Sequence, residues 1–237
     1  MSEPSSVNII SEDILCFQNQ KYHNMSIIRL RSEFPDFSDE TLARFLIARD
    51  GSIEKALLML RDHVVWRETN MPITKSSCLN ELLKGKVYVH GTDKDGHPLI
   101  VFRPVKNDMD VRDVDETFRM AQFWSEAIFS TIPAKFSKVT LLVNRTGGEN
   151  NADVPFIRLM AGIFQANYPE RLHKAIIYPS GFVFWALWNM LKYLADPVTQ
   201  AKISPVVRLS GVQEFIDDQY IPEEIGGTCK YDFDNNA

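Results

Sequence analysis

The sequence is poor in cysteine, and its three thiols, Cys16, Cys78 and Cys229, stand far apart. With an odd number of cysteines and no Cys-x-x-Cys pair, we expect reduced thiols and a cytoplasmic protein rather than a disulfide scaffold. The first residues, MSEPSSVNIISED, contain neither a basic start nor an apolar core. A secretory signal is therefore not predicted.

Basic residues are not in excess either. The chain carries 26 Lys and Arg against 31 Asp and Glu, and its formal net charge is −5. Nucleic-acid-binding domains usually show a strong basic excess. A nucleic-acid partner is therefore not expected, although a local basic site is compatible with this charge.

Motifs that carry catalysis or bind cofactors are also absent. The sequence has no Gly-x-Ser-x-Gly, no P-loop and no Gly-x-Gly-x-x-Gly. Metal-ligand spacing is not found among the five histidines, which are His23, His63, His90, His97 and His173. We therefore predict a protein that is not an enzyme and that holds neither a metal nor a cofactor.

The periodicity of apolar residues separates two kinds of region. Residues 21–71 have the spacing of helices, whereas strands and helices alternate across 86–209. The alternating region starts with two short strands within 86–104 that reverse at Asp95-Gly96. Strand–helix–strand units favour a largely parallel sheet. The elements expected after this hairpin are a helix at 113–130, a strand at 138–144, a helix at 153–168, a strand at 174–179 and a further strand within 201–209, which Pro205 weakens.

One stretch, GFVFWALWNMLKYLADPVTQAK at 181–202, is unusually apolar. From Phe182 to Ala195, only Asn189 and Lys192 are neither apolar nor aromatic. A helix of this length reaches about 21 Å, less than the roughly 30 Å of a hydrocarbon core, so a transmembrane helix is not predicted. Two interpretations are left: a buried core helix, or a helix that meets both protein and lipid.

The end of this stretch has the pattern of an anion site. Asp196 is placed to cap a helix that begins at Pro197, and Thr199 and Lys202 then share one face of that helix. A hydroxyl and an ammonium near a helix N-terminus suit a phosphate. A surface lysine beside a capping turn is the alternative interpretation.

Several stretches, in the same order along the chain, resemble landmarks of the CRAL-TRIO lipid-binding family. DETLARFLIARDGSIEKALLMLRDHVVWR (39–67) is similar to the helical region that precedes the lipid-binding domain. Similarity to the domain itself is carried by TDKDGHPLIVF (92–102), NYPERLHKAIIYPSGFVFWALWNMLKYLADPVTQAKI (167–203) and IPEEIGG (221–227). The resemblance divides the chain into a flexible lead (1–20), a helical domain (21–75), a lipid-binding domain (80–229) and a tail (230–237).

The resemblance implies an α/β fold in which a mixed, largely parallel sheet floors an apolar lipid cavity, preceded by a small all-helical domain. It also implies that 182–195 is a mobile gate helix, which lines the lipid when closed and touches the bilayer when open. Large aromatic side chains suit membrane interfaces. The expected lipid and membrane contacts of this helix are Phe182, Phe184, Trp185, Trp188 and Leu191.

For phosphatidylinositol transfer members of the family, the resemblance implies four head-group residues, and all four are present. They are Arg49 at the end of RFLIAR, Glu170 in YPER, and Thr199 and Lys202 in DPVTQAK. Arg49 and Lys202 suit the phosphodiester. Glu170 can accept from inositol hydroxyls, and Thr199 can bond a phosphate oxygen.

Members that also carry phosphatidylcholine place hydroxyl side chains around the choline head group. The alignment puts side chains without a hydroxyl at these places, namely Val89, Ile100, Val139 and Leu141. A buried phosphate without donors is costly. We therefore predict a phosphatidylinositol transfer protein with weak or no phosphatidylcholine binding.

Two other functions stay open. The chain is alternatively a carrier of a sterol or other small neutral hydrophobic ligand, or a lipid-sensing regulator of phosphoinositide signalling. A sterol is also the candidate for a second lipid beside phosphatidylinositol. We expect a monomer that is cytoplasmic and makes transient, reversible peripheral contact with a membrane surface.

Overall fold

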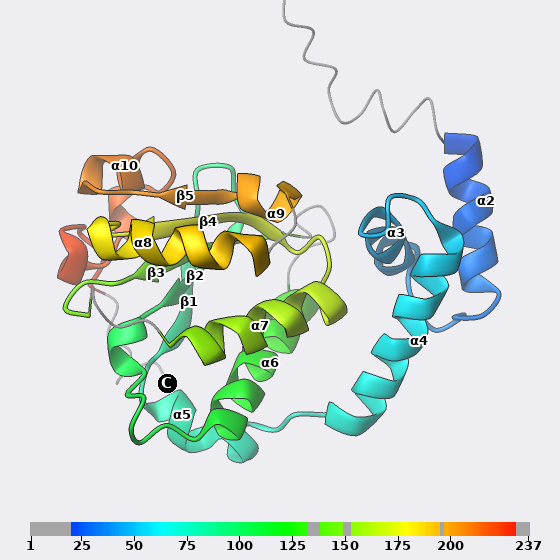
Figure 1. Ribbon diagram of the computed structural model, residues 1–237, viewed down its shortest axis with the longest axis horizontal. Coiled ribbons are helices and arrows are strands. Elements are labelled where there is room, and N and C mark those ends of the chain that lie inside the picture. The colour runs from blue at the N-terminus through cyan, green and yellow to red at the C-terminus, as the bar shows by residue number, and fades with distance from the viewer. Residues whose placement is uncertain (1–19, 132–137, 149–152, 195–196, 231–237) are drawn as a thin grey trace, which may run out of the picture. The chain divides into compact units, whose positions relative to one another are not determined.

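The computed structural model describes residues 20–131, 138–148, 153–194 and 197–230 (Figure 1). The chain divides into two compact units, Met1–Trp66 and Arg67–Ala237. Asp196, expected as a helix cap, lies outside the described residues, as do most of the N-terminal lead and of the C-terminal tail.

The first unit is helical. It contains α2 (Gln20–Arg31), α3 (Asp39–Ile47) and most of α4 (Ile53–Asn70). Ser38 caps α3, because its hydroxyl accepts a hydrogen bond from the Thr41 N–H at 3.3 Å. Apolar side chains of the three helices pack into one core, made by Ile27, Leu30, Phe34, Leu42, Phe45, Leu46, Ala56, Leu57, Met59 and Leu60.

The second unit is built on a five-stranded sheet with the order β1-β2-β3-β4-β5. β1 and β2 are antiparallel, and each later strand is parallel to the one before it. The predicted mixed, largely parallel sheet is thus confirmed. The strands are β1 (Val87–Thr92), β2 (Pro98–Phe102), β3 (Val139–Asn144), β4 (Leu172–Tyr178) and β5 (Ile203–Pro205).

Helices connect the parallel strands, as the alternating pattern predicts. α6 (Val114–Thr131) leads from β2 to β3, and α7 (Val154–Asn167) leads from β3 to β4. Between β4 and β5 lie α8 (Phe182–Leu191), the 3-10 helix η3 (Lys192–Leu194) and α9 (Pro197–Ala201). The helix expected at 182–195 is therefore α-helical only to Leu191. It ends in a tighter 3-10 turn, as many helices do.

Short elements complete the second unit. Before β1 lie η1 (Lys75–Cys78) and α5 (Leu79–Leu83), and η2 (Pro104–Lys106) follows β2. After β5 the chain forms α10 (Leu209–Gln213), η4 (Asp218–Tyr220) and η5 (Glu223–Ile225).

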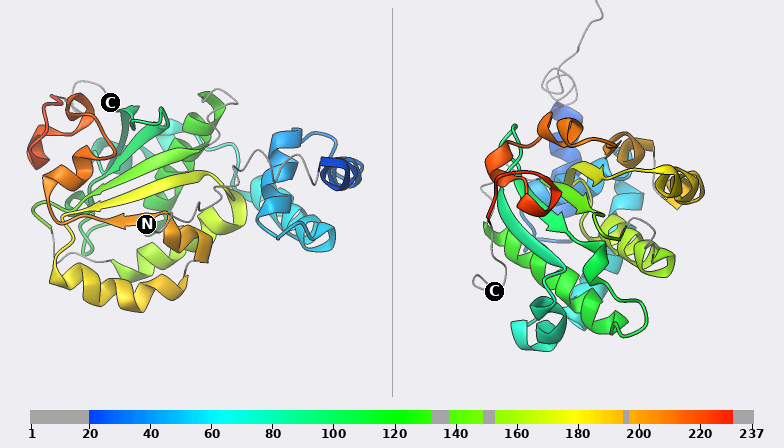
Figure 2. Two further views of the ribbon diagram at one scale, coloured as in Figure 1. Left: turned by 90° about the horizontal axis from the view of Figure 1, so that it is seen from above. Right: turned by 90° about the vertical axis from the view of Figure 1, so that its left-hand side faces the viewer.

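The strand order determines which face of the sheet each connection covers. Every parallel strand is added on the same side of its predecessor, and crossover connections are almost always right-handed. The helices of the three crossovers therefore lie on one face of the sheet, and the segment after β5 lies on the other (Figure 2). Phe156 of α7 accordingly contacts Phe102 of β2, with ring centroids 6.3 Å apart.

The face of the sheet that residues 206–229 cover is here called the packed face. Its side chains and those of the covering segment form the main core of the second unit. A contact with the Ile221 backbone explains a glycine in IPEEIGG, because a Cβ on Gly227 would lie 2.1 Å from the Ile221 carbonyl oxygen. The buried side chains of this core are Tyr88, Leu99, Val101, Leu142 and Ile176 from the strands, and Val206, Val212, Ile216, Ile221 and Ile225 from the covering segment.

Candidate functional site

Three of the four predicted head-group residues meet at one corner of the second unit. Glu170 lies two residues before the start of β4, while Thr199 lies in α9 and Lys202 directly precedes β5. Because β4 and β5 are parallel neighbours, the residues that enter them come together. Lys202 Nζ donates to Glu170 Oε2 at 3.2 Å, and the Lys202 N–H donates to the Thr199 carbonyl at 3.1 Å.

This head-group corner (Glu170, Thr199 and Lys202) is half-buried. The side chains of Lys202 and Glu170 are 18% and 24% exposed. Such a partly exposed ion pair contributes about 0–1 kcal/mol to stability. An ammonium has three donors, so Lys202 can hold Glu170 and bind an anionic oxygen at the same time.

The backbone of Glu170 adopts a conformation that non-glycine residues rarely take. Its φ is +56°, in the left-handed region, which costs a non-glycine residue about 1–2 kcal/mol. Residues on both sides hold the turn in place. Tyr168 Oη donates to Glu126 Oε1 at 3.0 Å, and the Arg171 guanidinium lies 4.4 Å from the centre of the Phe129 ring.

The Tyr168 hydroxyl is a reliable donor to Glu126. Its side chain is buried, and burial, with the Glu126 carboxylate next, raises the pKa of Tyr168 well above its ordinary value. The phenol therefore stays protonated at any physiological pH. This bond fixes the start of the YPER stretch just before Glu170.

Arg49, the fourth predicted residue, belongs to the first unit. It lies in the turn after α3, where its half-buried guanidinium donates to the Ala48 carbonyl at 2.8 Å. The next two residues, Asp50 and Gly51, have φ values of +51° and +78°. Aspartate tolerates this conformation better than most residues, which accounts for an acidic side chain directly after Arg49.

The predicted contacts of α8 differ strongly in their surroundings. Phe182 is 87% exposed and Trp185 is 46% exposed, whereas Phe184 is only 6% exposed. Trp188 is half-buried and stacks on Phe184 with 6.2 Å between ring centroids. The side chain of Leu191 lies outside the described residues. α8 thus has an inner pair, Phe184 and Trp188, and an outer pair, Phe182 and Trp185.

Sequence reasoning missed Arg145, which fastens the start of α8 to the sheet. It directly follows β3, and its buried guanidinium donates to the Pro179 carbonyl at 2.9 Å. Its N–H donates to the Tyr178 carbonyl at 2.7 Å, and its guanidinium lies 5.6 Å from the centre of the Phe184 ring. Nothing in the sequence separates this arginine from a surface arginine, because its partners are mainly backbone carbonyls of a distant loop.

The positions expected to lack choline-binding hydroxyls lie on the face that the crossover helices cover, here called the crossover face. Val89, Ile100 and Leu141 are direct neighbours across β1, β2 and β3, and Ala175 and Ile203 complete the row across β4 and β5.

Val139 precedes Leu141 by two residues on β3 and is buried. Thr140, between these two, points to the other face and donates its hydroxyl to Asp93 at 2.5 Å. The five-residue row therefore contains no side-chain hydrogen-bond donor.

A second row on the crossover face is equally apolar. It runs across all five strands as Val87, Phe102, Val143, Ile177 and Pro205. All residues of both rows are apolar, yet all of them except Ala175 are only half-buried. The crossover face thus offers an apolar surface that the protein's own helices do not fully cover.

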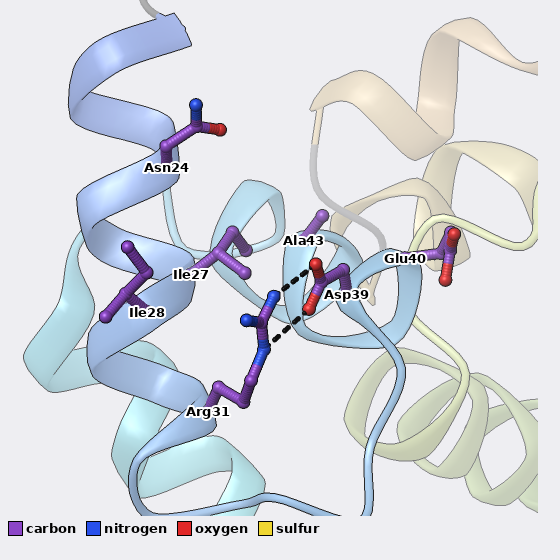
Figure 3. A pocket seen from close by; sticks show the side chains of 7 residues that line it. All are labelled: Asn24, Ile27, Ile28, Arg31, Asp39, Glu40 and Ala43. Carbon is purple, nitrogen blue, oxygen red and sulfur yellow. Dashed lines mark hydrogen bonds and ion pairs between the residues drawn. The ribbon is translucent and has the colours of Figure 1, made fainter.

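A separate hollow of about 480 Å³ lies in the first unit, between α2 and α3 (Figure 3). Arg31 of α2 and Asp39 of α3 form a two-point ion pair across it, with an Nε–Oδ1 distance of 3.0 Å. Its other lining residues are Asn24, Ile27, Ile28, Glu40 and Ala43. None of the predicted site residues lies there, so this hollow is not the candidate site.

Among the helices of the described residues, none has both the length and the apolarity needed to cross a membrane.

Comparison with known proteins agrees with the architecture. Residues 82–227 match the family model of the CRAL/TRIO domain. The crystal structure of Sfh5 is similar with a TM-score of 0.63 and 20% sequence identity, over 82% of this chain and 72% of that one. At this identity the likeness concerns the fold.

Three of the curated relatives come from two fungi and a plant. "Phosphatidylinositol transfer protein CSR1" of Eremothecium gossypii is 29% identical over 84% of this chain and 49% of its own length. "CRAL-TRIO domain-containing protein C365.01" of Schizosaccharomyces pombe is 30% identical over 82% of this chain and 58% of its own. "Phosphatidylinositol/phosphatidylcholine transfer protein SFH9" of Arabidopsis thaliana is 26% identical over 94% of this chain and 43% of its own. The chain thus spans about half the length of these relatives.

Proposed function

The chain belongs to the CRAL/TRIO domain family, and on this premise we propose that it binds phosphatidylinositol and transfers it between membranes. The observation that carries the proposal is the Glu170–Lys202 ion pair of 3.2 Å, which Thr199 adjoins. Two relatives named as phosphatidylinositol or phosphatidylinositol/phosphatidylcholine transfer proteins support the same class of ligand.

Each head-group residue supplies a different interaction. Lys202 balances the charge of the phosphodiester with its ammonium. Arg49, in the first unit, has a planar fork of donors of the kind that suits a phosphate. Thr199 donates its hydroxyl to a phosphate oxygen. Glu170 accepts from the inositol hydroxyls while it keeps Lys202 oriented. A sterol or another neutral ligand needs no such set, so the charged corner favours a phosphoinositide.

The acyl chains bind along the two apolar rows of the crossover face, enclosed by α8. Two acyl chains carry about thirty methylenes, and at about 0.8 kcal/mol each their burial from water contributes on the order of 25 kcal/mol. The bilayer offers nearly the same burial. The contacts at the head-group corner therefore decide which lipid is taken up, and no catalytic step is needed.

Phosphatidylcholine binds weakly in this proposal. The row of Val89, Ile100 and Leu141 offers a choline phosphate no hydroxyl, and a buried phosphate without donors is costly. On α8, Phe182 and Trp185 contact the bilayer, since they are the outward side chains and large aromatics suit the interface. Contact with the membrane is transient, because the protein must dock on a membrane to take up a lipid and must leave it again to carry the lipid to another membrane.

A vesicle assay tests the proposal. Labelled phosphatidylinositol in donor vesicles is transferred to acceptor vesicles by the wild-type protein, and by Lys202→Ala, Glu170→Gln and Arg49→Ala. We expect each substitution to slow transfer about tenfold or more, because each removes a contact to a charged group. Lys230→Ala, which breaks the exposed 4.0 Å pair with Glu223, is the matched control and should transfer normally.

Lipids extracted by the protein from mixed vesicles give a second, independent readout. Mass spectrometry should find phosphatidylinositol enriched over phosphatidylcholine. Normal transfer in both Lys202→Ala and Glu170→Gln would remove the site assignment. Extraction of sterol alone would mean that the ligand is a sterol and not phosphatidylinositol.

A further inference from the structure

Four metal-ligating side chains meet at the end of the sheet where β2 and β4 begin. One ligand atom from each lies within 4.8 Å of all the others, and the residues are Asp93, Asp95, His97 and His173. The proposed lipid site uses none of them. The two imidazole rings are stacked with centroids 3.7 Å apart, although they are distant in the sequence.

Asp93 is fixed by hydrogen bonds that leave its position little freedom. Its Oδ1 accepts from the N–H groups of Asp95 and His97 at 3.0 and 2.8 Å, and its Oδ2 accepts from the Thr140 hydroxyl at 2.5 Å. The carboxylate is buried. Outer hydrogen bonds of this kind orient the ligands of metal sites.

A β-bulge brings His173 to this place. The pairing of β3 with β4 passes from Val139–Leu172 to Thr140–Lys174, so His173 is the extra residue on β4. A bulge re-aims the side chain of its extra residue. The His173 ring is thereby turned against His97 at the start of β2.

The distances between ligand atoms are close to those that one small ion requires. Asp93 Oδ2 lies 3.3 Å from His97 Nδ1 and 3.9 Å from His173 Nε2, and His173 Nε2 lies 3.3 Å from Asp95 Oδ2. Four ligands at about 2.0–2.2 Å from a tetrahedral Zn²⁺ are about 3.3–3.6 Å from one another. Imidazole nitrogens together with carboxylates suit Zn²⁺, whereas Ca²⁺ and Mg²⁺ take oxygen ligands.

We propose that this cluster binds one Zn²⁺ ion. Four protein ligands close the coordination shell, so the ion has a structural role. It ties the turn after β1 to the start of β4, three residues after Glu170.

Zinc titration of the full chain, with any affinity tag cleaved off, tests the site. The protein is stripped with a chelator, and Zn²⁺ binding is followed against a competing indicator, with metal content measured by mass spectrometry. We expect one tightly held ion per chain. In His173→Ala and in Asp95→Asn, the affinity for Zn²⁺ should fall by about tenfold or more. The melting temperature of the wild-type protein should rise with Zn²⁺, and that of these variants should not.

A matched control separates this cluster from other zinc-binding groups. His90→Ala removes a half-buried imidazole of β1 that contacts Tyr220 outside the cluster, and it should bind Zn²⁺ like the wild type. The Asp95 side chain is 72% exposed, so Asp95→Asn should fold normally even if His173→Ala does not. Equal zinc affinity in wild type and Asp95→Asn, or no uptake by the wild type, would overturn the proposal. Neither result depends on phosphatidylinositol transfer.

Discussion

The two faces of the sheet carry the same kind of side chain, yet they are covered to very different extents. On the packed face, Leu142 and Ile176 have no exposed surface. On the crossover face, Leu141 and Ile177, their direct neighbours along the strands, remain half-buried. Hydrophobicity therefore decides that a residue lies in a central strand, but the covering segment decides whether it stabilises the fold or stays available to a ligand.

The largest effect should separate two adjacent leucines of β3. Leu142→Ala should lower the free energy of unfolding by about 3 kcal/mol, because it leaves a cavity in a fully packed core. Leu141→Ala should lower it by about 1 kcal/mol, since a half-buried side chain loses fewer contacts. Urea unfolding of both variants measures the difference. Equal losses would mean that the two faces are packed alike.

A glycine of the packed face should be the next most sensitive position. Gly227→Ala places a methyl group 2.1 Å from the Ile221 carbonyl oxygen, so the backbone must shift. We expect a loss of about 2 kcal/mol, typical of overpacking. Gly162→Ala in α7, where a Cβ meets nothing within 4 Å, is the control and should be neutral or stabilising. A neutral Gly227→Ala would contradict close packing of the covering segment.

The head-group corner should show the opposite relation between stability and function. Glu170→Gly relieves a left-handed φ and should raise stability by up to about 1 kcal/mol, while phosphatidylinositol transfer falls. Thermal unfolding and the vesicle assay are measured on the same preparation. Glu170→Gln keeps the strain and should lose transfer without gaining stability. A less stable Glu170→Gly would show that the ion pair with Lys202 outweighs the strain.

The smallest change in stability is expected on the crossover face. Ile100→Thr should cost less than about 1 kcal/mol, because the new hydroxyl is partly hydrated, and it should increase phosphatidylcholine uptake from mixed vesicles. Val101→Thr is the matched variant on the packed face. Val101→Thr should lower the free energy of unfolding more than Ile100→Thr does, since it buries the new hydroxyl completely. It should leave lipid selection unchanged, because it lies on the packed face. Unchanged phosphatidylcholine uptake in Ile100→Thr would separate the crossover face from head-group selection.

Much of the sheet could be predicted because each strand is a short apolar run bounded by turn residues, a pattern that can be seen in the sequence itself. The strand expected at 138–144 is found at Val139–Asn144, and the turn expected at Asp95-Gly96 is confirmed, with a φ of +89° at Gly96. Even the meeting of Glu170 and Lys202 follows once β4 and β5 are parallel neighbours, since both residues enter these strands. Local pattern and strand order together thus locate this part of the site.

Features that depend on long-range register could not be predicted. His97 and His173 meet only because β4 bulges by one residue, which no periodicity shows. Lys86 is another case: its ammonium is completely buried and pairs with Glu81, although a lysine is normally expected at the surface. For Arg49 the sequence offered a resemblance alone, because no strand order relates the first unit to the second.

The position of the covering segment along the chain has a consequence for synthesis. Translation delivers β1 to β5 and the crossover helices before residues 206–229, which close the packed face. Until those residues arrive, Val101, Leu142 and Ile176 have no partners, and a sheet with a bare apolar face is prone to aggregation. The nascent protein therefore needs the covering segment, residues 206–229, to complete this core. An interruption of translation directly after β5 would leave the apolar face of the sheet exposed and the chain prone to aggregation.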